Sequence, residues 1–292
     1  MSDIYTAIAA VGAISVLAFL FGRSIARRAR RRFILALAVA ACVVVVAFST
    51  VLRDSLLTPR LIPVSAVIVY GHWLLPAVCF LGGLASGSGT GRPVRKAALL
   101  APFLLLCVYQ SYGWVITDPP PVDDRWKNGV CWQTSPASCS AAAAATLLRA
   151  HGIDATESEM ARLCLTRSGG TPMHGLYRGL KLKTAGTGWR VEPFRADVES
   201  LRKEARPVIL SVRLDRREGV DPRYEQAWGW TPGVPHTVVL FGFRPGDKVE
   251  IGDPSVGREH WRVKDVDVLW HGDAIRLAPA RVQGPPATGL GH

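Results

Sequence analysis

The sequence of 292 residues has room for about two domains by length. Its formal net charge of +12 is typical of chains that bind nucleic acid or anionic lipid, but the basic residues concentrate in short loops between apolar runs. Because hydrophobic residues make up 49% of the chain, membrane topology accounts for much of the excess charge, and no nucleic-acid partner is expected.

Four apolar stretches near the N-terminus each have roughly the 20 residues that a helix needs to cross a bilayer. The first does not have the pattern of a cleaved signal peptide, because its leading residues include Asp3 and contain no Lys or Arg. An arginine block follows it instead. Residues 1–117 are therefore predicted to form an all-α membrane anchor with four transmembrane helices, at about residues 4–21, 33–52, 61–84 and 97–116.

Basic residues in the connecting loops set the predicted orientation. The first and third loops are rich in arginine and lysine, whereas the second has only Arg53 and Arg60, with Asp54 beside them. Loops one and three are therefore predicted to be cytoplasmic. This makes the chain a multi-pass cell membrane protein in which everything beyond Ile116 is extracytoplasmic.

Three other features of this half have ordinary interpretations. The SGSGTGR stretch (Ser86–Arg92) lacks the Gly-Lys-Ser/Thr context of a phosphate-binding loop and is interpreted as a flexible turn between helices. His72 is interpreted as a residue that forms an interhelical hydrogen bond, and is a weak site candidate. The arginine block is interpreted as an anchor for lipid headgroups.

The remaining sequence is predicted to contain one folded domain of the α+β class. Residues 118–122 (DPPPV) form a stiff proline-rich linker, residues 123–278 the domain, and residues 279–292 a disordered tail rich in Pro and Gly. Helices precede strands, and this order is typical of an α+β fold with an antiparallel sheet. The helices are predicted at 138–151, 156–163, 172–182 and 196–205, and the strands at 208–214, 236–243, 249–252 and 259–263.

The stretch Gln133–Leu148 (QTSPASCSAAAAATLL) is a polar turn followed directly by an alanine-rich helix. Pro136 and Ser138 favour the start of a helix, so the helix is predicted to begin near Cys139. A thiol at that position lies beside unpaired backbone N–H groups and the positive end of the helix dipole, which favour the reactive thiolate. A lone cysteine on a helix is more often a buried structural residue, so the interpretation depends on its partners.

Two later segments supply such partners. His236 begins an apolar strand, and Asp253 ends the next one, so a hairpin through residues 244–248 would place the two side chains at the same edge. His236 can then accept the thiol proton of Cys139, and Asp253 can orient the imidazole. The Gln133 amide and the Cys139 backbone N–H would form an oxyanion hole, a feature worth roughly 3–4 kcal/mol in other acyl-transfer enzymes.

The combination resembles the papain-like cysteine peptidases, and in particular the bacteriocin-processing family that removes double-glycine leader peptides. The similar stretches are QTSPASC, GTPMHGLYRGL, PHTVVLFGF and VEIGDPSVGREHW continuing to LWHGDAI. The resemblance implies a papain-like fold with a helical half and an antiparallel sheet, in which Cys139 is the nucleophile, His236 the base, Asp253 the orienting acid and Gln133 the oxyanion donor. Two features differ from the family: Ser140 replaces the usual Gly after the nucleophile, and four predicted helices replace a fused transporter.

Other residues leave alternatives open. Cys131 and Cys164 either form a disulfide outside the cell or stay free, and their spacing fits no zinc motif, so no metal or cofactor is expected. The insertion of residues 215–234 is interpreted as a wall over the substrate groove, and the tryptophans near it as core or groove-rim residues.

The predicted function is that of an outward-facing, membrane-anchored cysteine peptidase acting through a thioester acyl-enzyme on a peptide or protein substrate. One alternative is a catalytically silent peptidase-like module that binds a peptide. The other is an amide hydrolase or acyltransferase that acts on a non-protein substrate, since a Cys-His-Asp site does not specify the acyl donor.

Overall fold

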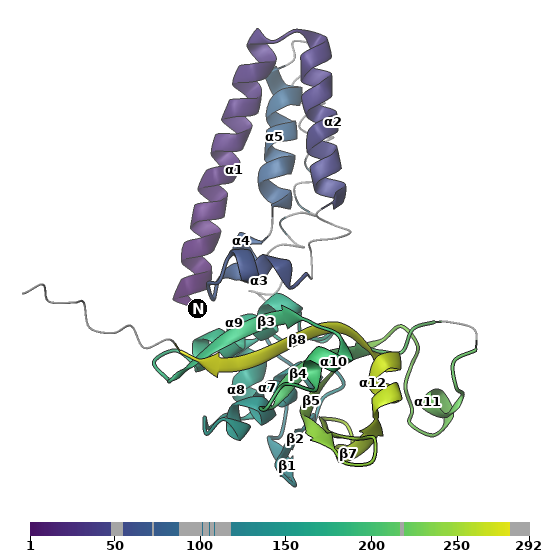
Figure 1. The fold of residues 1–292 in the computed structure, drawn as a ribbon. Helices are drawn as coiled ribbons and strands as arrows, with labels where there is room; N and C mark the ends of the chain where they lie inside the picture. The colour runs from purple at the N-terminus through teal and green to yellow at the C-terminus, as the bar shows by residue number, and fades with distance from the viewer. Residues whose placement is uncertain are drawn as a thin grey trace, which may run out of the picture.

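The computed structural model describes residues 1–47, 55–71, 73–87, 101, 105, 108, 118–216 and 219–280. Helices α1 (Ser2–Arg28), α2 (Arg31–Ala47) and α5 (Leu74–Gly87) stand side by side and form the helical part. Residues 118–280 form a separate α+β domain, and the short helices α3 (Leu57–Leu61) and α4 (Val67–Tyr70) lie between the two (Figure 1).

Two stretches of the described residues are long and apolar enough to cross a membrane, Ser2–Arg28 and Val67–Gly87. The first contains the first predicted span. The second predicted span is helical as far as Ala47, after which residues 48–52 lie outside the described part. The fourth, at 97–116, lies outside it except for single positions, as do His72 and most of the turn Ser86–Arg92.

The third predicted span, at 61–84, begins too early, because residues 62–66 are not helical. Helix α3 ends at Leu61 and α4 begins at Val67, so a first turn separates the two helices before the apolar stretch Val67–Gly87 begins. Pro63 accounts for the first turn, because proline has no N–H and disfavours helical backbone in the residue before it. Apolar side chains on either side of this turn pack against the α+β domain: Leu56 and Val67 belong to the same buried cluster as the helices of that domain.

Glycines allow α1 and α5 to approach closely. A Cβ atom on Gly22 of α1 would lie 2.5 Å from the carbonyl oxygen of Phe80, and a Cβ on Gly83 of α5 would collide with the backbone of Phe19. Such small-residue contacts are typical of helices that pack in a bilayer. Residues with higher numbers on α1 meet residues with higher numbers on α5, so the two helices run parallel with α2 antiparallel beside them (Figure 1).

The α+β class and the antiparallel sheet are confirmed. In the described part of the domain, six strands pair antiparallel throughout in the order β3-β8-β4-β5-β6-β7. A separate hairpin of β1 (Arg125–Lys127) and β2 (Val130–Trp132) precedes the first long helix. The six strands are β3 (Trp189–Arg195), β4 (Val208–Arg213), β5 (Pro235–Arg244), β6 (Lys248–Asp253), β7 (Gly257–Arg262) and β8 (Trp270–Pro279).

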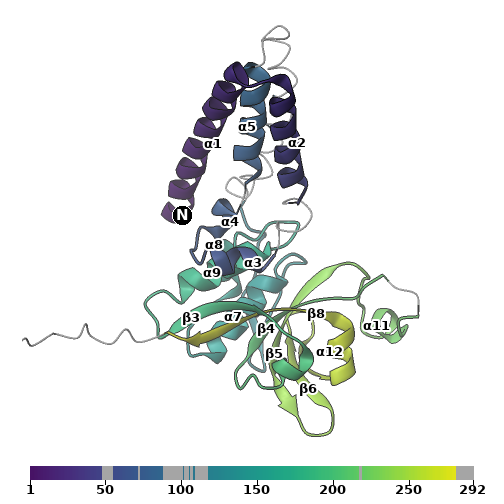
Figure 2. The ribbon, with the colours of Figure 1, turned by 45° about the horizontal axis from the view of Figure 1, so that its top comes forward.

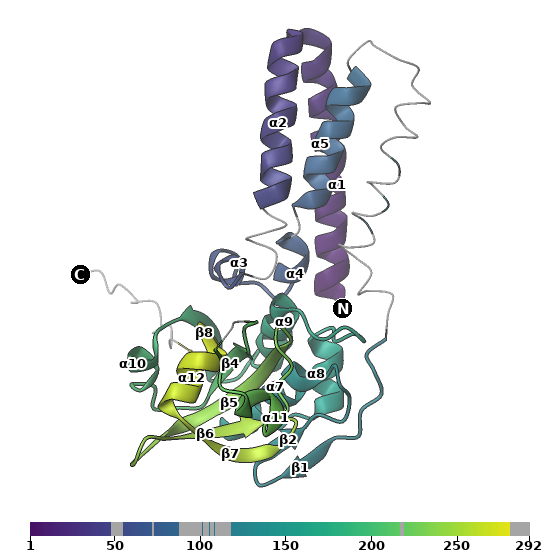
Figure 3. The same cartoon turned by 90° about the vertical axis from the view of Figure 1, so that its right-hand side faces the viewer.

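Helices cover both faces of this sheet (Figure 3). Alternate residues of β4 divide between two buried clusters: Ile209 faces the first, and Val208 and Leu210 face the second, as the two-residue period of a strand requires. The first cluster contains α7 (Cys139–Ala150), α8 (Glu157–Leu163) and α9 (Met173–Lys183), and the second contains α10 (Val198–Leu201) and α12 (Val263–Leu269). Two cores therefore hold the sheet in place from opposite sides.

The helical part joins the domain at the start of α1. Arg178 of α9, whose side chain is 1% exposed, donates to both carboxylate oxygens of Asp3 at 3.0 and 2.9 Å. His174 of the same helix contacts the carbonyl of Ser55, and Arg60 donates to the carbonyl of Pro193. The N-terminus of α1 thus lies against the domain, and its C-terminal end lies far from it (Figure 1).

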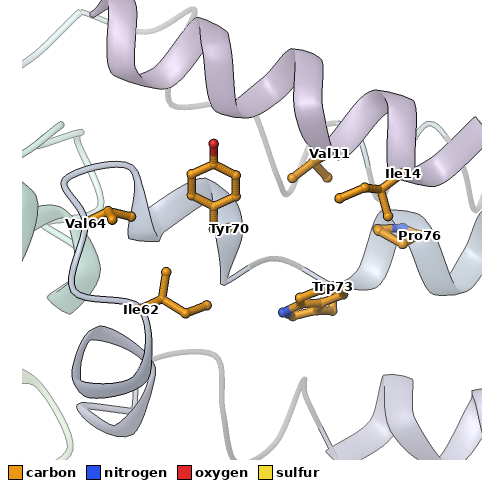
Figure 4. A pocket seen from close by; sticks show the side chains of 7 residues that line it. All are labelled: Val11, Ile14, Ile62, Val64, Tyr70, Trp73 and Pro76. Carbon is orange, nitrogen blue, oxygen red and sulfur yellow. The ribbon is translucent and has the colours of Figure 1, made fainter.

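An apolar cavity of about 300 Å³ lies between α1 and the Ile62–Pro76 stretch, and no described residue of the α+β domain lines it. Side chains of α1 face those of the Ile62–Pro76 stretch across it (Figure 4). Its lining contains hardly any polar surface and consists of Val11, Ile14, Ile62, Val64, Tyr70, Trp73 and Pro76.

Candidate active site

Cys139 is the first residue of α7, as predicted. The turn before it is closed by Ser138, whose hydroxyl donates to the carbonyl of Ser135 at 2.8 Å. The following alanines, 141–145, are fully buried and bring the helix close to the sheet. The thiol therefore sits at the N-terminal end of a buried helix, where backbone N–H groups favour its ionised form.

His236 and Asp253 meet at the edge of the β5–β6 hairpin, as the sequence predicts. His236 is the second residue of β5 and Asp253 is the last residue of β6. The imidazole Nε2 lies 2.8 Å from Oδ1 of the Asp253 carboxylate. That carboxylate oxygen also accepts hydrogen bonds from the backbone N–H and hydroxyl of Ser255, at 2.7 and 2.5 Å.

The Cys139 thiol lies close enough to the His236 ring for each group to shift the pKa of the other. Since Nε2 of the ring is occupied by Asp253, Nδ1 is the nitrogen available to the sulfur. The structure therefore brings together a thiol, an imidazole and a carboxylate that are far apart in the sequence and come from α7, β5 and β6.

The charges of the three groups support one another. Although burial disfavours the thiolate, hydrogen bonding to His236 and its positive charge lower the pKa of Cys139 below the ordinary value of 9.0. Burial also disfavours the imidazolium, but Asp253 and Cys139 together raise the pKa of His236 to about 10. Despite its burial, Asp253 has a lowered pKa because His236 and Ser255 donate to it. Near neutral pH these shifts favour a thiolate–imidazolium pair.

Gln133 lies beside the turn that follows Asp253. Its backbone N–H donates to the carbonyl of Pro254 at 2.8 Å, and its side-chain Nε2 donates to the carbonyl of Ser135 at 3.2 Å. That contact sets the orientation of the amide and leaves the second N–H of Nε2 for another acceptor. The next residue, Thr134, is held by the fully buried carboxylate of Glu157, which accepts from its N–H and its hydroxyl. The loop that carries Gln133 is therefore fixed from both sides.

The sequence did not assign Trp230 to the site. Its ring and the His236 imidazole form a T-shaped pair, with 5.6 Å between ring centroids and 78° between ring planes. Trp230 packs in turn on Trp261 of β7, which also stacks on Trp228. The three tryptophans are visible in the sequence as a group, but only the fold shows which of them contacts the imidazole.

The same loop carries the short helix α11 (Arg223–Gln226), which extends beside α12 (Figure 2). Tyr224 and Arg223 both bond to the buried carboxylate of Asp265. The described part of the predicted wall at residues 215–234 is therefore fixed to α12 and reaches the site through Trp230.

The other cysteines of the domain lie outside the site. Cys131 and Cys164 are fully buried free thiols, and burial raises the pKa of each to about 12. Cys131 and Cys164 are thus free thiols in the structure, and no disulfide joins them. Among the described residues, no group of His, Cys, Asp and Glu is arranged to hold a metal ion. Cys139 is thus the thiol of the domain with the environment of a nucleophile.

Comparison with known proteins agrees with this chemistry. Residues 127–218 match the model of the Peptidase C39 family, a range that includes Gln133 and Cys139 and ends before His236. The domain is a cysteine-type peptidase. No curated protein matches the chain.

Two of the solved structures that are similar to this chain come from transporters. One is a double-glycine-motif protease from an AMS/PCAT transporter in complex with its leader peptide, with 21% identity, a TM-score of 0.40, and coverage of 56% of this chain and 100% of that one. Another is the peptidase domain of Streptococcus ComA, a bifunctional ABC transporter involved in quorum sensing, with 22% identity, a TM-score of 0.40, and coverage of 51% and 96%.

Proposed function

We propose that this protein is a membrane-anchored, extracytoplasmic cysteine peptidase that hydrolyses peptide bonds through Cys139, His236 and Asp253. The observation that supports the proposal most strongly is the convergence of these three side chains: His236 Nε2 donates to Asp253 at 2.8 Å, and the thiol lies close enough to the imidazole for His236 to lower its pKa. In this assignment Cys139 is the nucleophile, His236 the acid and base, and Asp253 the orienting residue.

Acylation begins from the thiolate–imidazolium pair. The Cys139 sulfur attacks the carbonyl carbon of the peptide, a C–S bond forms, and the carbonyl electron pair moves onto oxygen. The free N–H of the Gln133 amide and the Cys139 backbone N–H donate to this oxyanion. When the intermediate collapses, the C–N bond breaks and the proton on His236 Nδ1 passes to the leaving amine. A thioester on Cys139 and a neutral His236 remain.

Deacylation returns the site to its starting state. His236 Nδ1 takes a proton from water as the water oxygen attacks the thioester carbon. The C–S bond then breaks, the acid product leaves, and Cys139 is again a thiolate beside an imidazolium. The net reaction adds one water across one peptide bond. Asp253 keeps its charge throughout and holds the ring in the orientation that both steps require.

The anchor and its orientation belong to the same proposal. Helix α1 is apolar and mostly exposed along its length, which suits contact with lipid. Its basic residues Arg23, Arg27 and Arg28 lie at the end opposite to Asp3, which touches the α+β domain. Because basic residues favour the cytoplasmic side, the domain lies on the outer side. The anchor is proposed to have four spans, with the third redrawn to Val67–Gly87.

Orientation is tested by a reporter fused after Leu277 in the full chain. We expect an alkaline phosphatase reporter, which is active only outside the cytoplasm, to be active at this position. A fusion after Arg28, at the far end of α1, serves as the matched control and is expected to be inactive. Activity of the second fusion alone would overturn the orientation.

The peptidase assignment is tested by labelling the full-length protein in detergent with a thiol-reactive peptide electrophile. We expect an adduct on Cys139 that is lost in His236→Ala and kept in Cys42→Ser, a control that removes an exposed thiol of α2. Hydrolysis of a peptide library is expected to disappear in Cys139→Ala. Equal labelling of all thiols, or labelling of Cys139 that is independent of His236, would contradict the assignment and favour a silent binding module.

A further inference from the structure

Ser140 and Thr237 form a contact that the proposed mechanism does not use. Ser140 follows the nucleophile and Thr237 follows the base, and their hydroxyl oxygens lie 2.8 Å apart. Both residues are 6% exposed, so water does not compete for these groups. The Ser140 oxygen also lies 4.0 Å from the Cys139 sulfur. One buried hydroxyl pair thus connects the first turn of α7 to the start of β5.

We propose that Thr237 and Ser140 act as a two-hydroxyl relay that stabilises the Cys139 thiolate and fixes its distance from His236. In this relay the Thr237 hydroxyl donates to the Ser140 oxygen, and the Ser140 hydroxyl donates to the sulfur. Both are positioning residues, and the inference rests on the proposed role of Cys139 as nucleophile.

The order of the donors follows from charge. Two hydroxyls at 2.8 Å share one hydrogen bond, so one of them donates and the other accepts. A thiolate accepts hydrogen bonds and cannot donate, so a negative sulfur attracts the proton of the nearer hydroxyl, Ser140. That leaves Thr237 as the donor to Ser140. Accepting this bond polarises the Ser140 hydroxyl and strengthens its own donation to sulfur.

The surroundings of the sulfur agree with this arrangement. Besides His236, the Ser140 hydroxyl and the backbone N–H of Thr237 are the groups that lower the pKa of Cys139 against the effect of burial. Thr237 therefore acts twice, directly through its N–H and indirectly through Ser140. Glycine at position 140 would remove the hydroxyl, so this chain has a thiolate donor that such a sequence lacks.

The relay is tested by titrating Cys139 without any substrate. The rate of alkylation by iodoacetamide is measured across pH in the full-length protein, and the Cys139 adduct is quantified by peptide mass spectrometry. We expect Ser140→Ala to raise the apparent pKa of Cys139 by about one unit, equivalent to about a tenfold change in the ionisation equilibrium. Thr237→Val is expected to raise it less, and Thr237→Ser to restore it.

Non-additivity separates the relay from a general packing effect. The Thr237 side chain acts on the sulfur only through Ser140. Adding Thr237→Val to Ser140→Ala is therefore expected to cause no further change in the pKa of Cys139. Thr184→Val is the matched control, because it removes another buried hydroxyl, one that bonds to Leu180 at the end of α9. It is expected to leave the Cys139 pKa unchanged.

Two results would overturn the relay: an unchanged Cys139 pKa in Ser140→Ala, or a Thr237→Val effect that is undiminished in the double variant. Because Ala is a strong helix former, the Ser140→Ala variant is expected to fold. It therefore tests the relay even where Thr237→Val does not fold. The titration needs no substrate. A failure to hydrolyse peptides therefore counts against the proposed function alone, and an unchanged pKa in an active enzyme counts against the relay alone.

Discussion

The Asp253 carboxylate stabilises the site through a single oxygen atom. Oδ1 accepts from the His236 ring and twice from Ser255, so the carboxylate is held in place before it acts on the imidazole. Its charge and its acceptor oxygen make different contributions. The oxygen fixes the ring orientation, and the charge stabilises the imidazolium.

The two contributions can be separated by substitution. Asp253→Ala removes both, and we expect kcat/KM to fall by about 100-fold or more. Asp253→Asn keeps an acceptor oxygen for Nε2 but lacks the charge, so a smaller loss is expected, together with a lower pKa of His236. The pH profile of kcat/KM measures both effects, with Asp273→Asn on β8 as the control. Equal losses in the two variants, with no shift in the profile, would contradict this division.

The pH range of activity follows from the two shifted groups. The lowered pKa of Cys139 places the acid limb of kcat/KM below pH 9.0, and the raised pKa of His236 places the alkaline limb at about 10. Activity requires a deprotonated thiol and a protonated ring, so it rises with pH through the first value and falls through the second. Because Cys139 and His236 interact, the two limbs give apparent pKa values of the coupled pair and not of either residue alone. An acid limb at or above pH 9.0 would show that the ion pair does not form.

At the scale of elements, the loop before β5 depends on one buried carboxylate. Asp265 of α12, 1% exposed, accepts from Tyr224 at 2.9 Å and from Arg223, and it also caps its own helix by accepting from the N–H of Arg262 at 2.8 Å. Because α11 and Trp230 belong to the same loop, this carboxylate helps to hold Trp230 against His236.

Asp265→Ala is expected to release α11 from α12. The Tyr224 hydroxyl loses its acceptor, and this loss and that of the helix cap should lower the free energy of unfolding by about 1–3 kcal/mol. The loop should also become sensitive to proteolysis. Chemical denaturation and limited proteolysis measure these effects, and Asp267→Ala, on an exposed position of the same helix, is the control. Resistance of the loop to protease in Asp265→Ala would show that other contacts hold it.

Local signals in the sequence predicted the elements that carry the site. Helix α7 begins at Cys139, Thr156 caps α8 by accepting from the N–H of Glu159, and the β5–β6 hairpin joins His236 to Asp253. Each depends on residues close together in the chain, such as a cap or a turn.

Elements that depend on distant partners were missed. Strand β3 contains Pro193, which argues against a central strand, yet β3 lies at the edge of the sheet, where proline is tolerated. Its partner β8 comes more than 70 residues later and lies between β3 and β4. Helix α12 was also missed, and predicted helix 196–205 is shortened to Val198–Leu201. The predicted linker 118–122 has neither helix nor strand, and the tail beyond residue 280 lies outside the described residues.

At the scale of the whole molecule, a buried ion pair joins the helical part to the domain. Arg178 is 1% exposed and donates to both oxygens of Asp3 and to the carbonyl of Leu163. An arginine this deeply buried needs its partner, because an unpaired charge loses hydration without compensation. The N-terminus of α1 and helix α9 are therefore energetically coupled.

This coupling predicts an order of stabilities. Asp3→Ala leaves the Arg178 charge unpaired and should destabilise the junction by about 3 kcal/mol. Asp3→Ala combined with Arg178→Met removes both charges and should be less destabilised than Asp3→Ala alone. Hydrogen exchange of α9 in detergent or nanodiscs measures the effect. If the double variant exchanges faster than the single one, the pair does not couple the two parts.

The central claim, that Cys139 is a nucleophile activated by His236, is tested most directly by trapping the acyl-enzyme. Full-length protein is mixed with a peptide p-nitrophenyl ester, quenched in acid within the first turnover, digested and analysed by mass spectrometry. We predict that the acyl mass lies on the peptide containing Cys139, that hydroxylamine removes it, and that His236→Ala lowers its amount more than tenfold. Turnover of the ester with the acyl group on another residue, or on none, would contradict the account.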